Sequence, residues 1–436
     1  MSFTFTGGLD LQSRRRRPLP AIRVFSNPTH IVLDFPDGKK AAFDALVAPG
    51  DRVSVYDRVG TLTAGEDVIP VFSGISGVVR ELVTDGADTV TGVVIDGDGE
   101  EKRGETAGYT GPLTEFTPEM IVDIMKEAGI RCRGSYGFIY KRIEAAGDGT
   151  VKLILNCCES EPGVTSRKKL LDEDLEAVLN GAKIVMKAVD VRKCDAAIEQ
   201  DSALRSVLAS RVRKDPLFDV RKMKRRYPQD EETSMIYALG GPRLSDVSRP
   251  ELSKYVMIDA ETAASVYRAA AFGVPYCSRV VTVGNENVLC PIGTPVSELL
   301  EFCGVETSHH DKIIAGGPMR GRACALTGSY VGPDTDAVTV LTEKDGRPIP
   351  EMTECTHCGR CVSVCPSRIM PYYIAQLSRK KKYSACLDYG AAACTECGCC
   401  DYVCPSYIPI KKLIRIAKSR SSAAPEKEHN ENTETV

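Results

Sequence analysis

Two stretches near the C-terminus, CTHCGRCVSVCP (residues 355–366) and CTECGCCDYVCP (residues 394–405), share one pattern of cysteines. In each stretch, two residues separate the first cysteine from the second and the second from the third, and three residues separate the third from a fourth, which lies directly before a proline. This spacing is typical of paired [4Fe–4S] sites, in which the fourth cysteine of each run binds the other cluster. The pattern therefore predicts two [4Fe–4S] clusters in a helical, ferredoxin-type domain over residues 341–418.

The crossing of the fourth ligand divides the eight cysteines into two predicted sets. The first set is Cys355, Cys358, Cys361 and Cys404, and the second is Cys394, Cys397, Cys400 and Cys365. A pair of zinc sites is the alternative, but zinc usually takes two separated Cys-x-x-Cys pairs. Three further residues in this segment fit no ligand position, and we expect packing roles for Cys386 and Cys399 and a surface position for His357.

The composition agrees with a large intracellular redox protein. The chain has 436 residues, a net charge of −3 and 18 cysteines, ten of which lie between Cys355 and Cys404. Such a concentration in a long chain indicates metal binding rather than disulfides, and the slightly acidic balance argues against a nucleic-acid binder. No apolar run approaches the roughly 18–20 residues that cross a bilayer. We expect a cytoplasmic protein, with peripheral attachment to the membrane as the alternative.

The N-terminal quarter, residues 1–105, has the pattern of a β-rich domain. Short β-branched runs alternate with the turn pairs Asp37-Gly38, Pro49-Gly50, Asp85-Gly86 and Asp96-Gly97. The arginines at 14–17 are expected to form a solvated arm, with docking to an acidic partner or a membrane as the alternative. This segment predicts a small β-sandwich.

Residues 106–275 alternate between helical and strand patterns, which predicts an α/β layer with a parallel sheet. Thr117-Pro118 has the form of a helix start, residues 151–155 that of a buried strand, and residues 170–189 that of one long helix. Residues 276–340 return to short strands with one helix near residues 296–303. The tail at 419–436 is poor in apolar residues, and we expect it to be disordered.

Three polar segments in the α/β region are candidates for a ligand site. AGIRCRGSYGF (128–138) supplies glycines that let a backbone approach a phosphate. NCCESEPG (156–163) follows a strand, where α/β folds bind ligands, and YPQDEET (227–233) adds further carboxylates. Each segment alone is also compatible with a plain polar loop.

Together these segments resemble the flavin- and NADH-binding subunit of respiratory complex I and its relative RnfC, the peripheral subunit of the Rnf electron-transport complex. The corresponding family motifs are close to GRGGAGF, NADESEPGT and GEET, which here read CRGSYGF, NCCESEPGV and DEET. The order of TFTGG, IIAGGPMRG and the two cysteine runs is similar to RnfC over roughly residues 3–418. The soluble RnfC-like protein associated with proline reductase is a further resemblance.

The resemblance implies four domains: a barrel-sandwich-like β domain (1–105), a Rossmann-like FMN and NADH domain (106–275), a β-grasp-like SLBB domain (276–340) and the ferredoxin-type domain. It also implies that NADH reduces FMN and that FMN passes single electrons to the clusters, because a hydride carries two electrons and each cluster accepts one. The residues implied to hold FMN or NADH are Gly134, Gly137, Phe138, Asn156, Glu159, Glu161, Glu231 and Glu232. Glu159 and Cys158 are the predicted catalytic residues.

The chain departs from the family at Cys132, Ser135 and Tyr136 in the glycine loop and at the Cys157-Cys158 pair. Cys158 occupies the position of a flavin-contacting Asp, so either a redox thiol or a packing residue is possible there. Two functions remain open. The first is an NADH-oxidising flavo-iron–sulfur protein that serves membrane Rnf subunits or a soluble reductase. The second is an iron–sulfur adaptor that has lost nucleotide binding and only relays electrons between proteins.

Overall fold

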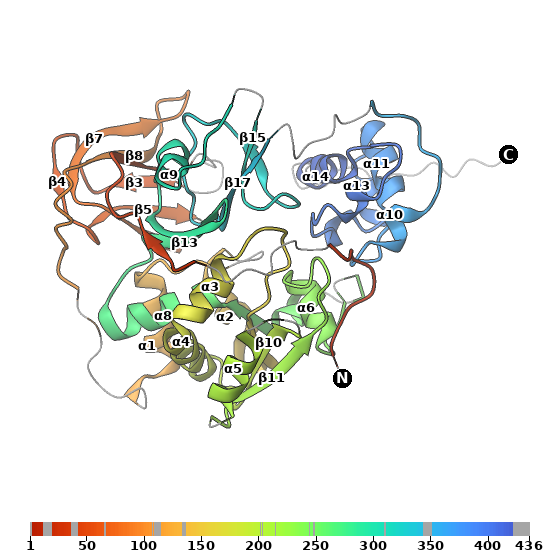
Figure 1. The fold of residues 1–436 in the computed structure, drawn as a ribbon, viewed down its shortest axis with the longest axis horizontal. Coiled ribbons are helices and arrows are strands. Elements are labelled where there is room, and N and C mark those ends of the chain that lie inside the picture. Colours follow the sequence, from red (N-terminus) through yellow and green to blue (C-terminus); the bar gives the residue numbers. More distant parts are fainter. Residues whose placement is uncertain are drawn as a thin grey trace, which may run out of the picture.

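The computed structural model describes residues 2–11, 20–35, 42–64, 67–106, 108, 115–132, 137–200, 202, 204–213, 215–243, 245–246, 249–308, 311–342 and 351–421. Four sequence predictions lie outside these residues: the arginine arm at 14–17, the turn at Asp37-Gly38, the role of Gly134, and the tail beyond residue 421. The predicted disorder is wrong at the start of the tail, because residues 419–421 are helical. The described part has a mixed α/β architecture (Figure 1). None of its helices is long and apolar enough to span a membrane.

The N-terminal strands form two antiparallel sheets, drawn in red and orange in Figure 1. Inward residues alternate with outward ones, as in β2, where Ile31 and Leu33 are buried. One sheet has the order β2 (His30–Asp34), β8 (Val90–Gly97), β7 (Gly77–Thr84) and β4 (Arg52–Val53); the other has β3 (Ala42–Ala45), β5 (Arg58–Ala64) and β6 (Asp67–Phe72).

The predicted turn at Asp96-Gly97 is wrong, because both residues belong to strand β8. Asp96 pairs with Val78, and Gly97 pairs with Gly77. A Cβ on Gly77 would lie 1.8 Å from the Asp96 carbonyl oxygen. The glycines at this position therefore allow two backbones to approach closely rather than allowing the chain to turn.

The α/β layer has a four-stranded parallel sheet in the order β11-β10-β9-β12. Its strands are β9 (Lys152–Asn156), β10 (Cys194–Glu199), β11 (Phe218–Met223) and β12 (Tyr255–Asp259). The helices of this layer are α1 (Pro118–Glu127), α2 (Ile139–Ala146) with the 3-10 turn η2 (Gly147–Gly149), α3 (Ser166–Glu173), α4 (Leu175–Ala188), α5 (Leu204–Val212), α6 (Glu232–Ala238), α7 (Arg249–Ser253) and α8 (Ala260–Phe272). The strand order therefore reverses about β9, and the carboxyl ends of β9 and β12 lie side by side.

The helix predicted to start at Thr117-Pro118 is confirmed, because the Thr117 hydroxyl accepts a hydrogen bond from the amide of Met120 at 3.2 Å. The single helix predicted over residues 170–189 is instead two helices, α3 and α4. They break at Asp174, whose backbone leaves the helical region (φ −131°, ψ 46°). The apolar spacing continues across the break, so the pattern alone did not reveal it.

A six-stranded sheet joins the third region of the chain to its N-terminal part. Its order is β1 (Arg23–Val24), β14 (Glu286–Pro291), β13 (Ser278–Val283), β17 (Ala337–Leu341), β15 (Lys312–Ala315) and β16 (Arg322–Cys324), and helix α9 (Val296–Phe302) packs beside it. Strand β1 adds in parallel to β14. The short segment around residues 23–24 thus belongs structurally with residues 278–341, which no local sequence pattern indicates.

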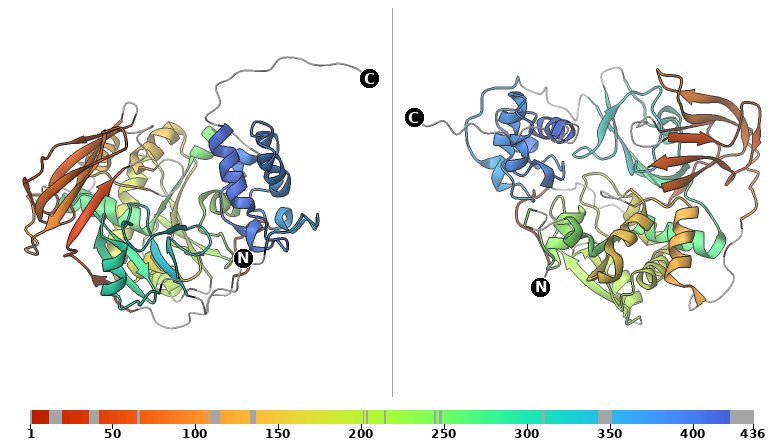
Figure 2. Two further views of the ribbon diagram at one scale, coloured as in Figure 1. Left: turned by 90° about the horizontal axis from the view of Figure 1, so that it is seen from above. Right: turned by 180° about the vertical axis from the view of Figure 1, so that it is seen from behind.

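The cysteine-rich segment folds into short helices around a separate small core (Figure 2, blue). The helices are α10 (Arg360–Ser363), α11 (Pro371–Arg379), α12 (Ala385–Asp388), α13 (Cys399–Tyr402) and α14 (Ile410–Ser421), with the 3-10 turn η3 (Ala391–Ala393). Ile374 and Ile414 lie at the centre of this core, and Cys386 and Cys399 are fully buried. His357 is exposed. These three positions agree with the sequence prediction.

Residues 2–11 form a strap between the α/β layer and the cysteine-rich segment, seen as the dark red trace in Figure 1. Phe3 pairs with Met223 at the end of β11, and the amide of Leu9 donates to the Tyr227 carbonyl at 2.8 Å. The amide of Gly8 donates to the Val364 carbonyl at 2.7 Å. The strap therefore bonds both parts through backbone groups, which explains why its sequence carries no strong pattern.

We predict that Gly7→Ala loosens the strap. Gly7 has φ +86°, and a Cβ there would lie 2.7 Å from the Cys365 carbonyl oxygen, so the substitution adds a clash to a backbone strain of about 1–2 kcal/mol. Gly50→Ala is the matched control, because Gly50 also has positive φ (+95°) but nothing lies within 4 Å of its Cβ position. In thermal unfolding followed by cluster absorbance, Gly7→Ala should bleach several degrees below Gly50→Ala. Equal midpoints would contradict the role of the strap.

Candidate functional site

A cavity of about 650 Å³ lies where the N-terminal strands, the glycine loop and the six-stranded sheet meet, and we call it the interdomain cavity. Its apolar wall includes Phe35, Leu62 and Phe138, and its polar wall includes Arg131 and Glu161. The volume is within the usual range of small-molecule sites. The mixture of flat apolar surface and charged groups suits a ligand with a ring system and an anionic group.

Arg131 and Phe138, near the two ends of the glycine loop, line this cavity. The two ends of the loop are paired, because Arg131 and Phe138 form a β-bridge and the amide of Cys132 donates to the Gly137 carbonyl at 3.1 Å. Residues 133–136 between them lie outside the described part of the chain. The Arg131 guanidinium lies 4.5 Å from the centre of the Phe138 ring, and its Nε is buried without a partner among the described residues.

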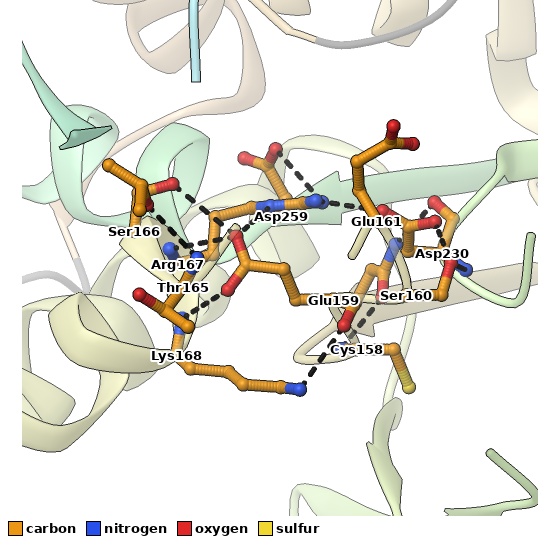
Figure 3. A network of polar contacts seen from close by, with 12 residues as sticks. Cys158, Glu159, Ser160, Glu161, Thr165, Ser166, Arg167, Lys168, Asp230 and Asp259 are labelled. Atoms are coloured by element: carbon orange, nitrogen blue, oxygen red, sulfur yellow. Dashed lines mark hydrogen bonds and ion pairs between the residues drawn. The ribbon is translucent and has the colours of Figure 1, made fainter. Parts of the chain in front are cut away.

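The acidic segment after β9 lies at the carboxyl ends of the parallel strands, where open α/β sheets bind ligands. Asn156 fixes this turn: its Nδ2 donates to the Asp230 carbonyl at 3.0 Å, and its Oδ1 accepts from the amide of Cys158 at 2.9 Å. The Glu159 carboxylate accepts from the amides of Arg167 and Lys168 at the start of α3 (Figure 3). Both residues therefore build the loop from inside and are not on the wall of the interdomain cavity.

Glu161 is the predicted residue of this segment that reaches the cavity. Its carboxylate accepts from the amides of Met319 and Arg320 at 2.5 and 3.0 Å and pairs with the Arg320 guanidinium at 3.0 Å. A Cβ on Gly317 would lie 1.9 Å from the Glu161 side chain. The GGPMRG segment thus covers Glu161, and position 317 must be glycine because a side chain there would clash with Glu161.

Two arginines neutralise the buried carboxylates (Figure 3). Arg167 contacts Asp230 at 2.8 Å, Glu159 at 3.5 Å and Asp259 at 4.0 Å. Arg320 also contacts Asp230 at 2.8 Å. Burial by itself lowers the pKa of both guanidinium groups, but the surrounding carboxylates raise it overall, so both stay charged. The sequence did not indicate these two residues, because Asp230 lies far from both in the sequence and the Arg167–Glu159 pair follows no periodic pattern.

The two carboxylates of DEET have structural partners. Glu231 caps helix α6 by accepting from the amides of Thr233 and Ser234, and Glu232 forms a buried ion pair with Arg142. Neither lines the interdomain cavity. In the structure these two carboxylates form a helix cap and an ion pair, and their cofactor contacts stay a prediction.

The predicted catalytic role of Cys158 is not supported by its surroundings. Its side chain is fully buried, donates to the Ala197 carbonyl at 3.6 Å, and packs among Phe5, Ile154 and Met235. In Figure 3 the thiol points away from the carboxylates. Burial, followed by the charge of Glu199, raises the pKa of Cys158 well above its usual value.

We predict that Cys158 does not react in the folded protein, because the thiolate is the nucleophile and a raised pKa removes it at neutral pH. Iodoacetamide at pH 8 should leave Cys158 unmodified in native protein and modify it after unfolding in guanidinium, as read by peptide mass spectrometry. Cys158→Ala should transfer electrons at the wild-type rate. Rapid native labelling, or loss of transfer in the variant, would restore the redox-thiol hypothesis.

The eight cysteines of the two runs gather around two separate cavities. The outer cavity, of about 790 Å³, is lined by Cys355, Cys358, Cys361 and Cys404. The inner cavity, which is smaller and more enclosed, is lined by Cys394, Cys397, Cys400 and Cys365, and also by Cys399. Each run thus contributes its fourth cysteine to the cavity of the other run, as the predicted sets require. The ligand role of each cysteine stays a prediction.

The donor set suits clusters better than single ions. Within the described residues, no three His, Cys, Asp or Glu side chains converge where one metal ion could bind. Thiolates on a cubane bind different iron atoms and need not converge. Burial raises the pKa of Cys365 to about 11 and that of Cys394 to about 12, so cluster binding must release protons from these thiols.

A junction connects the acidic segment to the inner cavity. The Tyr227 hydroxyl donates to the Cys397 carbonyl at 2.5 Å, and the Arg320 guanidinium lies 5.7 Å from the centre of the Tyr227 ring. Lys411 Nζ donates to the Met319 carbonyl at 2.8 Å. Tyr227 is the N-terminal residue of the YPQDEET segment, but only the fold reveals that it contacts a cluster-binding loop.

Comparison with known proteins gives matches over the same two regions. The family model for the Nuo51 FMN-binding domain matches residues 125–268, and that for a 4Fe-4S dicluster domain matches residues 344–408. The C subunit of the Na(+)-translocating ferredoxin:NAD(+) oxidoreductase complex of Acetobacterium woodii is 29% identical over 396 residues, which is 88% of this chain and 89% of that protein. The C subunit of the proton-translocating complex of Clostridium ljungdahlii is 29% identical over 398 residues, covering 88% and 86%.

Among solved structures, the NAD+-reducing [NiFe]-hydrogenase in the H2-reduced state covers 71% of this chain and 61% of its own, with 17% identity and a TM-score of 0.44. That score is too low to bear on the assignment.

An FMN-type α/β layer joined to a two-cluster segment defines a flavo-iron–sulfur electron-transfer protein, with FMN and [4Fe–4S] clusters as its cofactors. Over most of its length the chain is similar to the C subunits of Rnf-type complexes, at 29% identity.

Proposed function

We propose that this chain oxidises NADH at an FMN in the interdomain cavity and delivers the electrons singly, first to the inner and then to the outer cluster. The observation that carries the proposal is the junction: Glu161 lines the cavity, Arg320 pairs with Glu161, and Tyr227 lies between Arg320 and the Cys397 carbonyl. When bound, FMN supplies the conversion between a hydride and single electrons. The net reaction converts NADH to NAD+, releases one proton to solvent and sends two electrons out through the clusters.

The residues of the cavity have distinct roles in this proposal. The Phe138 and Phe35 side chains offer flat apolar surface to a ring system. Arg131, whose Nε has no partner among the described residues, would bind an anionic group such as the FMN phosphate. Glu161 would hold the polar edge of the ligand, oriented by the amides of Met319 and Arg320. Gly137, at the end of the glycine loop, lets the backbone approach the ligand.

We also propose a finer domain scheme to go with this arrangement. We infer a barrel-sandwich-like domain over 1–105, an FMN and NADH domain over 106–275, an SLBB-like β-grasp domain over 276–340, and a ferredoxin-type domain over 341–418. The partner that takes the electrons is proposed to be a membrane subunit of an Rnf-type complex, as the relatives' names suggest. A soluble reductase is the alternative partner.

One observation favours a second function, an iron–sulfur adaptor without nucleotide chemistry. Glu161 and Asp230 already have a countercharge in Arg320, and Glu159 has one in Arg167, so less of the acidic segment is available to a ligand. In an adaptor, these ion pairs would only hold the layers together.

Anaerobic purification followed by optical spectroscopy separates the two functions. The first predicts a flavin spectrum in the isolated protein and bleaching of both flavin and cluster absorbance when NADH is added. Protein that holds clusters but no flavin, and whose clusters stay oxidised with NADH and are reduced by dithionite, would be an adaptor.

A further inference from the structure

The cluster-bearing segment differs in charge from the rest of the chain. Residues 351–421 contain eleven Lys and Arg against five Asp and Glu, whereas the whole chain has 56 against 59. The excess of positive charge is therefore concentrated on the part of the protein from which electrons must leave. Charge of one sign around a redox centre selects partners of the opposite sign.

The positive charges around the two cavities are arranged differently. Next to the inner cavity, Arg415 and Lys418 pair with Glu396 at 2.6 and 3.2 Å. At the outer cavity, Arg360, Arg379 and Lys380 line the rim, and the described residues offer them no ion pair. Glu354 is the acidic residue among those that line the outer cavity. The unpaired positive charge is thus at the outer rim.

The outer cavity is also the accessible one. Cys358 is exposed, whereas Cys365, Cys397 and Cys400 around the inner cavity are buried. A row of aromatic rings leads from the outer cavity to the surface: His357 contacts Tyr372 (5.9 Å between ring centres), Tyr372 contacts Tyr373 (4.3 Å), and Tyr373 contacts Tyr389 (5.2 Å). Tyr373 and Tyr389 are each 39% exposed. Exposed tyrosines beside arginines are typical of protein interfaces.

We propose that this outer face, formed by Arg360, Arg379, Lys380 and the ring row from His357 to Tyr389, docks a redox protein whose electron-transfer face is acidic. The proposal rests on the proposed function in one respect, the exit of electrons from the outer cluster. An anionic membrane could also bind a basic face, but it accepts no electrons. The position of the charges around the exposed cluster cavity, and not on a long apolar helix face, favours a protein partner.

The test uses the whole anaerobic protein, with its clusters and any bound FMN reduced by dithionite that is then removed, so that the result does not depend on NADH oxidation. Stopped-flow absorbance follows oxidation by two probes of opposite charge, acidic rubredoxin and basic cytochrome c. With the wild-type protein, we expect the second-order rate with rubredoxin to fall as salt is added and the rate with cytochrome c to rise.

Two double variants locate the effect. Arg379→Glu with Lys380→Glu reverses two charges at the outer rim, and Lys412→Glu with Arg420→Glu reverses two exposed charges on α14 away from that cavity. At low salt the first variant should slow rubredoxin about tenfold or more and speed cytochrome c, and the second should leave both rates within about twofold. Equal effects of the two variants, or no salt dependence, would overturn the proposal. The proposal would also be overturned if the first variant kept the wild-type rate with rubredoxin but no longer bound phosphatidylglycerol vesicles. Protein that binds no clusters would instead refute the proposed function.

Discussion

Arg167→Met is expected to lower the free energy of unfolding by about 3–5 kcal/mol, because it removes the countercharge from buried carboxylates. The Arg167 side chain is 4% exposed, and those of Glu159 and Asp230 are fully buried. Methionine fills much of the volume of the arginine side chain. The loss of stability therefore measures the removal of the charge and not the creation of a cavity. Arg320 remains near Asp230, but Glu159 would keep only two amide donors, the Ser166 hydroxyl and the nearby Lys168.

The control for this prediction is Arg211→Met. Arg211 pairs with Glu176, but the two side chains are 50% and 58% exposed, so the expected cost is about 0–1 kcal/mol. Urea unfolding under anaerobic conditions, followed by circular dichroism, measures both variants. Losses of the same size would mean that the network around Arg167 is solvated, and the description of the acidic segment as a buried scaffold would then be wrong.

Cys365→Ser is expected to abolish the cluster of the second cysteine run while leaving that of the first run in place. The reason is the crossing: Cys365 lies in the first run but lines the inner cavity with Cys394, Cys397 and Cys400. Cys404→Ser should do the reverse, because Cys404 lines the outer cavity. Each variant should retain roughly half of the iron and sulfide, since one of two clusters is lost.

Whether the fourth cysteine of each run binds the other cluster is decided by comparing the spectra of pairs of variants. The electron paramagnetic resonance spectrum of reduced Cys365→Ser should equal that of Cys397→Ser, and the spectrum of Cys404→Ser should equal that of Cys358→Ser. Cys386→Ala is the control, because Cys386 is buried in the same small core but lines neither cavity, and it should keep both clusters. If Cys365→Ser instead matched Cys358→Ser, each run would ligate its own cluster.

The cluster-binding segment could be predicted from the sequence because its signal is local. The spacing of the eight cysteines specifies both the chemistry and the pairs of residues that must meet. The helix after Thr117 was predictable for the same reason, since a capping residue and a proline lie directly before it. The prediction of a turn at Asp96-Gly97 was wrong because a glycine can serve either a turn or a close approach of two strands, and a single sequence does not distinguish them.

The acidic site could be predicted only in part. The segment around Glu161 was identified, but the residues that determine what its carboxylates do come from elsewhere: Arg320 lies 159 positions away and Tyr227 lies 170 positions from Cys397. Asn156 and Glu159, which were predicted to line a cofactor site, hold the loop that presents Glu161, and their contact with a cofactor stays a prediction. Long-range ion pairs have no periodic signal, so only the folded chain reveals them.

The central claim, that electrons pass from the interdomain cavity to the inner cluster and then to the outer one, is tested most directly by rapid-freeze paramagnetic resonance after mixing with NADH. With Cys404→Ser, which keeps the inner cluster, we expect reduction by NADH as fast as in the wild-type protein. With Cys365→Ser, which keeps the outer cluster, we expect reduction by NADH to be slowed at least about a hundredfold although dithionite still reduces it, because the relay beside Tyr227 is missing. Fast reduction of the outer cluster in Cys365→Ser would contradict this order.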